Sequence, residues 1–120
     1  MKRTYTKLTP AMVNQRVMVS GWVHSRRDHG GLIFIDLRDH TGIVQLVANP
    51  DTPDAFTHAE ELRDEYVIRA EGQVRERASE LQNNKIPTGA IEIAVDSIVI
   101  LNRAETLPIQ PFAEENQAGE

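Results

Sequence analysis

The stretch "GGLIFIDLRDHTGIVQLVA", residues 30–48, decides the fold class of this chain. Two runs in it, GGLIFIDLR and GIVQLVA, are rich in β-branched residues and flank the polar turn DHT. In the first run apolar residues recur at every second position, which is the pattern of a strand with one buried face. The stretch therefore predicts two strands, 30–38 and 42–48, joined by a turn.

The same two-residue period occurs in three further segments, which are separated by Gly, Pro, Asn and Asp residues. These segments predict strands at 16–24, 65–76 and 90–101. Between the third and fourth strands, "DTPDAFTHAEELRD" predicts one short amphipathic helix. Thr52 is expected to cap its N-terminus and Pro53 to occupy its first position.

Three strands, a helix and two strands follow one another in the order of an OB-fold. We predict an all-β protein, a five-stranded OB-fold Greek-key barrel with one short helix between strands 3 and 4. A five-stranded sandwich and an SH3-like barrel are the structural alternatives. The two-residue period stops after Leu101, and the sequence beyond it holds two prolines and an acidic tail. We expect residues 1–104 to form the domain and residues 105–120 to form a linker.

The composition excludes several classes of protein. A chain of 120 residues fits one domain with a single apolar core. Because cysteine is absent, neither a disulfide nor a thiolate zinc site can form, and the four histidines show no metal-ligand grouping. No apolar run approaches the roughly 20 residues of a membrane span. We expect a soluble, cytoplasmic protein with no metal site and no membrane partner.

The charge of the chain is unevenly distributed. A net charge of -5 argues against an indiscriminate binder of nucleic acid, because such affinity comes from many Lys and Arg contacts to phosphates. However, the first 27 residues contain six basic residues and no acidic one. One end of the chain could therefore meet a polyanion, although a chance distribution of solubilising charge explains the same asymmetry.

One aromatic ring is predicted to lie among polar side chains. Isoleucine and leucine share the apolar face of the strand 30–38, which turns Phe34 to the opposite face. The same alternation turns Gln45 outward together with Val47 in the third strand, and turns Glu92 outward in the fifth. If the barrel has the predicted order, the ring, the amide and the carboxylate share one surface.

This combination of groups suits the recognition of unpaired bases. An exposed ring offers a stacking surface, while an amide and a carboxylate can read base edges. Arg26 and Arg27 precede the turn at Gly30 and could hold phosphate or base. Each residue also has an ordinary explanation: the phenylalanine could belong to a core, and the arginines could pair with Asp28 or Asp39.

Three segments carry a family resemblance. The sequences "GWVHSRRDHGGLIFIDLRDHTGIVQLV" (21–47), "ELRDEYVIRAEGQVRER" (61–77) and "TGAIEIAVDSIVILNRAETLP" (88–108) together closely resemble the N-terminal anticodon-binding domain of bacterial-type aspartyl-tRNA synthetases. In that family this OB-fold domain grips the anticodon of tRNA(Asp). A separate class II catalytic domain makes aspartyl-adenylate from ATP, with Mg²⁺, and transfers the aspartate to the tRNA.

The resemblance implies that tRNA binding and catalysis belong to different domains of the full-length protein. This chain is expected to bind tRNA and to contain no catalytic residue and no cofactor of its own, and residues 105–120 would lead to the catalytic domain. The full-length enzyme would be an aspartate–tRNA ligase that forms a homodimer through that domain. The same domain of an asparaginyl- or lysyl-tRNA synthetase, and a free-standing OB protein that binds single-stranded nucleic acid, are the functional alternatives.

Matching positions assign roles to single residues. Phe34 corresponds to a ring that stacks on the middle anticodon base, Gln45 to the amide that reads this base, and Glu92 to a carboxylate that reads guanine. Ser25 departs from the family, which often has a basic residue there, so one phosphate contact is expected to be absent. The complete predicted anticodon-binding set is Arg26, Arg27, His29, Phe34, Gln45 and Glu92.

His29 adds a prediction about specificity. It lies at the tip of the predicted hairpin, which in this family is near the third anticodon base, the base that separates tRNA(Asp) from tRNA(Asn). A histidine there resembles the enzymes that charge both tRNAs, so tRNA(Asn) is predicted as a second partner. The alternative is a solvent-exposed turn histidine without a role in binding.

Overall fold

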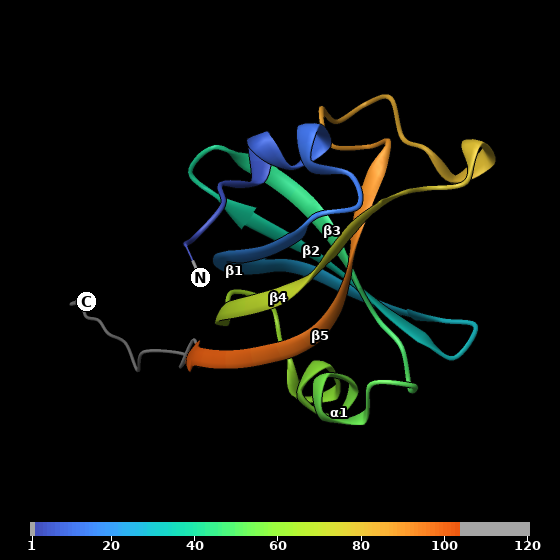
Figure 1. The fold of residues 1–120 in the computed structure, drawn as a ribbon. Helices are drawn as coiled ribbons and strands as arrows, with labels where there is room; N and C mark the ends of the chain where they lie inside the picture. The colour runs from blue at the N-terminus through green and yellow to red at the C-terminus, as the bar shows by residue number, and fades with distance from the viewer. Residues whose placement is uncertain (1, 104–120) are drawn as a thin grey trace.

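The computed structural model describes residues 2–103, which form a closed five-stranded barrel (Figure 1). The strands follow the order β1-β2-β3-β5-β4 around the barrel, with β3 and β5 parallel and the other described pairs antiparallel. This arrangement confirms the predicted OB-fold. The strand bounds are β1 Arg16–His29, β2 Leu32–Asp39, β3 Gly42–Ala48, β4 Val67–Glu76 and β5 Ile91–Asn102.

Every second side chain of a strand points into the barrel and fills its interior, as the sequence pattern predicts. Most inward positions of the strands are occupied by Val, Ile, Leu or Ala, with Gly21 in β1 and Gly72 in β4 as exceptions. Burial of this apolar surface is the main force that stabilises the barrel. The largest fully buried hydrophobic side chains are Ile33, Ile35, Leu37, Leu46, Ile68, Ile93, Val17, Val19, Val23, Val44 and Val74.

The first strand is longer than predicted. The prediction that it ends at residue 24 was wrong, because β1 continues to His29. The pairing with β2 shifts register between Val23 and Ser25, and beyond this irregularity the polar run RRDH still pairs with β2. Gly30 and Gly31 then make the two-residue turn with φ of 61° and 81°, values that glycine adopts without steric cost.

Short helices cover the two ends of the barrel (Figure 1). Helix α1, Pro53–Glu61, begins with Pro53 as predicted and turns Ala55 and Ala59 into the core. The predicted side-chain cap is wrong: the Thr52 hydroxyl donates instead to the carbonyl oxygen of Asn49, at 3.0 Å. At the opposite end lies the 3-10 helix η1, Thr6–Met12, which the sequence analysis did not predict.

Asp39, at the end of β2, fastens η1 to the barrel. Its side chain is almost fully buried, at 3% exposure, and accepts hydrogen bonds from two regions of the chain. The backbone N–H and the hydroxyl of Thr6 each donate at 2.9 Å. The backbone N–H and hydroxyl of Thr41 donate at 2.8 and 2.6 Å, and the N–H of Gly42 at 3.1 Å.

The hydrogen bonds of Asp39 determine its ionisation. Burial alone would raise its pKa, but the hydrogen bonds from Thr41 and Thr6 stabilise the carboxylate more strongly and leave the pKa below its usual value.

The segment between β4 and β5 carries the short 3-10 helix η2, Ser79–Leu81. Of the helices in residues 2–103, none has the length and apolar character needed to cross a membrane. The predicted linker, residues 105–120, lies outside the described residues.

Candidate nucleic-acid interface

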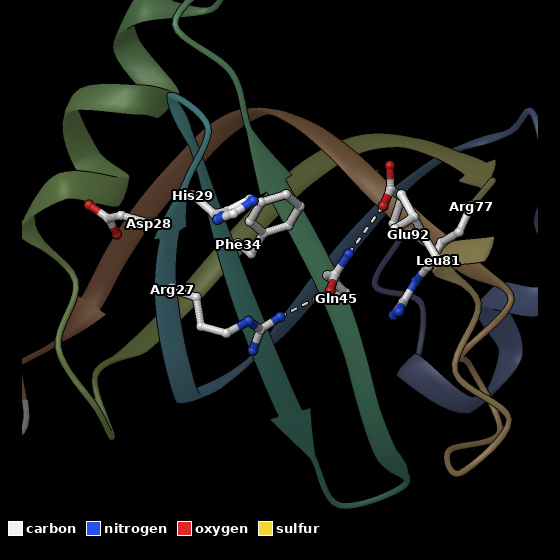
Figure 2. Close-up of a pocket in the computed structure, with 8 residues that line it drawn as sticks. All are labelled: Arg27, Asp28, His29, Phe34, Gln45, Arg77, Leu81 and Glu92. Carbon is white, nitrogen blue, oxygen red and sulfur yellow. Dashed lines mark hydrogen bonds between the residues drawn. The ribbon is translucent and has the colours of Figure 1, made fainter. Parts of the chain in front are cut away.

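An open hollow of about 690 Å³ lies on the barrel face formed by the β1–β2 hairpin, β3, β5 and the segment after β4 (Figure 2). Five of the six residues predicted to contact an anticodon line it, and Arg26 does not. The hollow is lined by Arg27, Asp28, His29, Phe34, Gln45, Arg77, Leu81 and Glu92.

Phe34 is placed at the hollow by its strand. Ile33 and Ile35, its neighbours in β2, are buried in the core, whereas Phe34 is half-buried and lies outside the core cluster. Across the sheet its partners are Arg27 in β1 and Val47 in β3. The ring thus has a packed side and a side that faces the hollow, as a stacking surface requires.

A chain of polar contacts crosses the floor of the hollow and involves all five strands. Arg27 donates from one terminal nitrogen to Asp36, at 2.6 Å, and from the other to Oε1 of Gln45, at 3.0 Å. Nε2 of Gln45 donates to Oε1 of Glu92, at 3.1 Å, and Glu92 accepts at 2.7 Å from Arg75 through Oε2. Two of these contacts are drawn in Figure 2.

This chain fixes the orientation of the Gln45 amide. A cation on one side can only donate and a carboxylate on the other can only accept, so the amide oxygen must face Arg27 and the amide nitrogen must face Glu92. Each partner retains capacity for a ligand: the amide has a second N–H and a second lone pair, and each carboxylate oxygen of Glu92 has a further lone pair.

The third strand is more buried than its alternation predicts. Gln45 and Val47 were expected to face solvent, but their exposures are 8% and 2%. Val47 pairs with Phe34 on one side and with Ala94 of β5 on the other, so neighbouring strands enclose it. Gln45 is the middle member of the polar chain and lines both hollows, so a ligand that enters them can reach its amide.

Arg26 points to a different part of the molecule. It forms an ion pair with Asp28, at 2.8 Å, and donates to the carbonyl oxygen of Glu60 at the end of α1, at 2.6 Å. The hydrogen bond with Asp28 raises the pKa of the Arg26 guanidinium. Arg26 therefore links the β1–β2 hairpin to α1, and it does not line the hollow with the other five predicted residues.

Arg77 is the main residue of the hollow that the sequence analysis missed. It follows β4, is only 9% exposed, and donates through Nε to the carbonyl oxygen of Ile91, at 2.9 Å. Burial lowers its pKa, although the nearby Glu92 and Asp36 oppose the shift, and an arginine remains charged in either case. Arg75 and Arg77 stand two residues apart at the end of the fourth predicted strand, so continued alternation could have indicated a second cation here.

A second hollow, of about 490 Å³, adjoins the first. Arg27, Gln45, Arg77 and Leu81 line both, so the two form one groove across the face. The second hollow adds His24 and Arg38 among other residues. A groove that offers one aromatic ring, amide and carboxylate groups and several cations can hold a short run of unpaired nucleotides, with bases on the ring and phosphates near the cations.

The family of the chain follows from this fold together with its sequence. Residues 17–101 match the tRNA anti-codon family model, described as an OB-fold nucleic acid binding domain, and the chain belongs to this family. Within the family it is similar to a segment of aspartate–tRNA ligases, which confirms the resemblance to aspartyl-tRNA synthetases.

Three relatives illustrate the similarity. The chain is 51% identical over 108 residues to the aspartate–tRNA(Asp/Asn) ligase of Jannaschia sp. (strain CCS1), a match of 90% of this chain and 18% of the ligase. It is 50% identical over 118 residues to the aspartate–tRNA ligase of Staphylococcus haemolyticus (strain JCSC1435), with 97% and 20% covered. The solved asparaginyl-tRNA synthetase from Pyrococcus horikoshii, complexed with asparaginyl-adenylate, superposes with a TM-score of 0.73 at 26% identity, covering 98% of this chain and 26% of that one.

Proposed function

We propose that this chain is the anticodon-binding domain of an aspartate–tRNA ligase and that the groove around Phe34 holds the anticodon bases of tRNA(Asp). The observation that carries the proposal is the polar chain that fixes Gln45 and Glu92 beside the open face of Phe34. Groups held in this way are preorganised, so a base that enters the groove meets its partners without the cost of ordering them.

Each group has a distinct role in the proposal. One base stacks on Phe34, and Gln45 uses its remaining N–H and lone pair to read that base. Glu92 accepts from the N1–H and N2–H donors of guanine at the first anticodon position. Arg27 and Arg77 supply positive charge for phosphates or carbonyl oxygens.

The activity of the whole ligase also belongs to the proposal, because this chain spans only about a fifth of the curated relatives it matches. We propose that residues 105–120 lead from this domain to a catalytic domain, which would aspartylate tRNA with ATP and Mg²⁺ and would form the homodimer in the cytoplasm. The described residues contain no group of three or more His, Asp and Glu side chains that could hold a metal ion.

Glu92→Gln should relax the preference for guanine at the first anticodon base. An amide presents one acceptor where the carboxylate presents two, so we expect the discrimination between guanine and adenine to fall about tenfold, the lower part of the range for one base contact. The measurement is equilibrium binding of anticodon stem-loops that differ only at this base. Glu60→Gln, on the exposed end of α1, is the matched control. An equal loss of affinity for every first base would show that Glu92 does not read guanine.

His29 is the residue we propose for dual tRNA specificity. It lies next to the turn and lines the groove, and several relatives are named aspartate–tRNA(Asp/Asn) ligases. An imidazole can donate or accept, and the two glycines after it allow the turn to adjust, so the tip can accept either pyrimidine at the third anticodon base.

This assignment predicts comparable charging of tRNA(Asp) and tRNA(Asn) by the full-length enzyme. His29→Leu should make charging selective for one of the two tRNAs, by about tenfold or more in kcat/KM, because it removes the imidazole that accommodates either pyrimidine. His58→Leu, exposed on α1, serves as control. A wild-type preference for tRNA(Asp) of about a thousandfold, some 4 kcal/mol, would contradict dual specificity while leaving anticodon binding itself intact.

A further inference from the structure

The two ends of the barrel differ in charge. Figure 1 shows α1 at one end and η1 at the other. The segment 49–65, which contains α1, has one basic residue, Arg63, and several exposed acidic ones: Asp51, Asp54, Glu60, Glu61, Asp64 and Glu65. Residues 2–15, which contain η1, hold Lys2, Arg3 and Lys7 and no acidic residue. A polyanion that lies in the groove is therefore attracted toward the η1 end and repelled from the α1 end.

The outward face of β2 leads from the groove to the η1 end. Phe34, Asp36 and Arg38 alternate with buried residues along the strand, so they share this face. Arg38 lines the second hollow, and the turn that follows β2 presents the exposed His40. At about 3.3 Å per residue, His40 lies roughly 20 Å from Phe34 along the strand direction. A base that stacks on Phe34 cannot reach His40, so a contact there would be made by RNA that continues out of the groove.

Two residues from the N-terminal segment gather beside His40. The Tyr5 ring, 39% exposed, meets the His40 ring edge to face, with the ring centroids 4.9 Å apart and an interplanar angle of 83°. The Arg3 guanidinium lies over the Tyr5 ring, 5.1 Å from its centroid, and donates to the carbonyl oxygen of Ser20, at 3.3 Å. These contacts hold the Arg3 charge at the surface next to the turn.

Lys7 adds a second cation beside the same turn. Its backbone N–H donates to the hydroxyl of Thr41, at 3.3 Å, and its side chain is exposed. Within residues 2–103, Arg3, Lys7 and Arg38 form no ion pair with a carboxylate. Asp39 is buried beneath them, so the charges that face solvent here are cations. We call this set the end surface; its members are Arg3, Tyr5, Lys7, Arg38 and His40.

The end surface suits phosphates better than it suits bases. Guanidinium and ammonium groups make charge-assisted hydrogen bonds to phosphate oxygens, and the Tyr5 hydroxyl is a further donor. Arg3 lies over the Tyr5 ring and His40 contacts it, so this ring is less open to stacking than Phe34 is. A paired RNA stem keeps its bases stacked inside and presents its phosphates and 2′-hydroxyls to a protein.

We propose that the end surface binds the phosphate backbone of the base-paired stem that adjoins the anticodon. The inference rests on the proposed function, because the bases in the groove determine where the stem begins. The RNA leaves the groove past Arg38 and continues along the η1 end, while the acidic α1 end repels it. Phosphate contacts position a nucleic acid without reading its sequence, so the end surface sets the affinity and the orientation of the stem.

The double variant R3Q/K7Q tests the proposal in the 120-residue chain. Its ligands are a tRNA(Asp) anticodon stem-loop and the loop sequence alone as a linear, unpaired oligonucleotide. The variant should bind the stem-loop about tenfold more weakly at roughly 0.1 M salt, and the slope of log K against log salt should become shallower by about 1 for each cation removed. Its affinity for the linear oligonucleotide should stay within about twofold of the wild type.

Three variants control for total charge and for folding. R63Q/R103Q removes the same charge from exposed positions near α1 and should leave the salt slope unchanged. R3K/K7R keeps both charges and should retain the wild-type slope. Lys7→Gln alone, which removes only an exposed side chain, should make the slope shallower by about half as much as the double variant.

Wild-type binding of the stem-loop by R3Q/K7Q, or an equal loss of affinity for the stem-loop and the linear oligonucleotide, would overturn the proposal. Phe34→Ala distinguishes this failure from a failure of the proposed function, because loss of the stacking ring should weaken binding of both RNAs. If Phe34→Ala weakens both and R3Q/K7Q weakens neither, the groove binds the anticodon and the end surface does not bind the stem.

Discussion

Asp39→Asn should lower the free energy of unfolding by about 2–3 kcal/mol, since a buried acceptor of several hydrogen bonds is replaced by a group that also carries donors. Oδ2 accepts from the backbone N–H of Thr6, while Oδ1 accepts from Thr41, Gly42 and the hydroxyl of Thr6. An amide nitrogen in the place of either oxygen would face an N–H or O–H donor. Chemical denaturation at neutral pH measures the loss, which would lower the melting temperature by on the order of 10 °C in a domain of this size.

The same carboxylate should contribute to the pH dependence of stability. Its pKa is lower in the folded protein than in the unfolded chain, so folding is favoured when the group is ionised. This contribution is complete above the unfolded pKa, about 3.9, and disappears as the pH falls through the lower pKa of the folded state. The difference in unfolding free energy between wild type and Asp39→Asn should therefore narrow toward low pH.

Asp64→Asn provides the control, because Asp64 is exposed and lies in the segment between α1 and β4. It should change stability by less than about 0.5 kcal/mol, as is usual at exposed sites. A comparable effect of the two substitutions, or a difference between wild type and Asp39→Asn that stays constant from neutral to acidic pH, would contradict the role assigned to Asp39.

Phe34→Ala should weaken binding of a tRNA(Asp) anticodon stem-loop by about 1–3 kcal/mol, which is the range for loss of one base-stacking surface and corresponds to a five- to 150-fold rise in Kd. The fold should be retained, because the half-buried ring lies outside the core cluster. Parallel titration and thermal melting of wild type and variant test both statements.

Two further substitutions separate stacking from simple packing. Phe34→Leu keeps most of the apolar volume but removes the flat ring, so it should bind almost as weakly as the alanine variant, while Phe34→Trp should restore affinity. Val99→Ala, on another face of the barrel, should bind like the wild type. Unchanged affinity in Phe34→Ala, or a large loss of melting temperature, would place the ring in the core.

Much of the barrel could be predicted because alternation is a local property. The runs around Phe34 and Glu92 show the period of a strand within a few residues, and Pro53 marks the start of α1 equally locally. The extension of β1 to His29 was missed because it depends on an irregularity in pairing with β2, which lets a polar run continue as a strand.

The other differences between the prediction and the structure also arise from contacts that the local sequence does not show. Contacts between residues far apart in sequence bury Gln45 between Arg27 and Glu92, place Arg77 against Ile91, and anchor η1 through Asp39. Alternation assigns a side chain to one face of a strand, but it does not reveal which neighbours cover that face. For this reason five of the predicted site residues lie together, while Arg26, adjacent to one of them, is directed to α1.

The most direct test of the proposed anticodon site is an NMR titration of the isotopically labelled 120-residue chain with a tRNA(Asp) anticodon stem-loop, compared with a fully paired duplex of the same stem. We predict that the stem-loop shifts the resonances of His29, Phe34, Gln45, Arg77 and Glu92, and that the duplex shifts them far less, because only unpaired bases can enter the groove. Shifts confined to other faces of the barrel, or equal shifts with the stem-loop and the duplex, would contradict the claim that this groove binds anticodon bases.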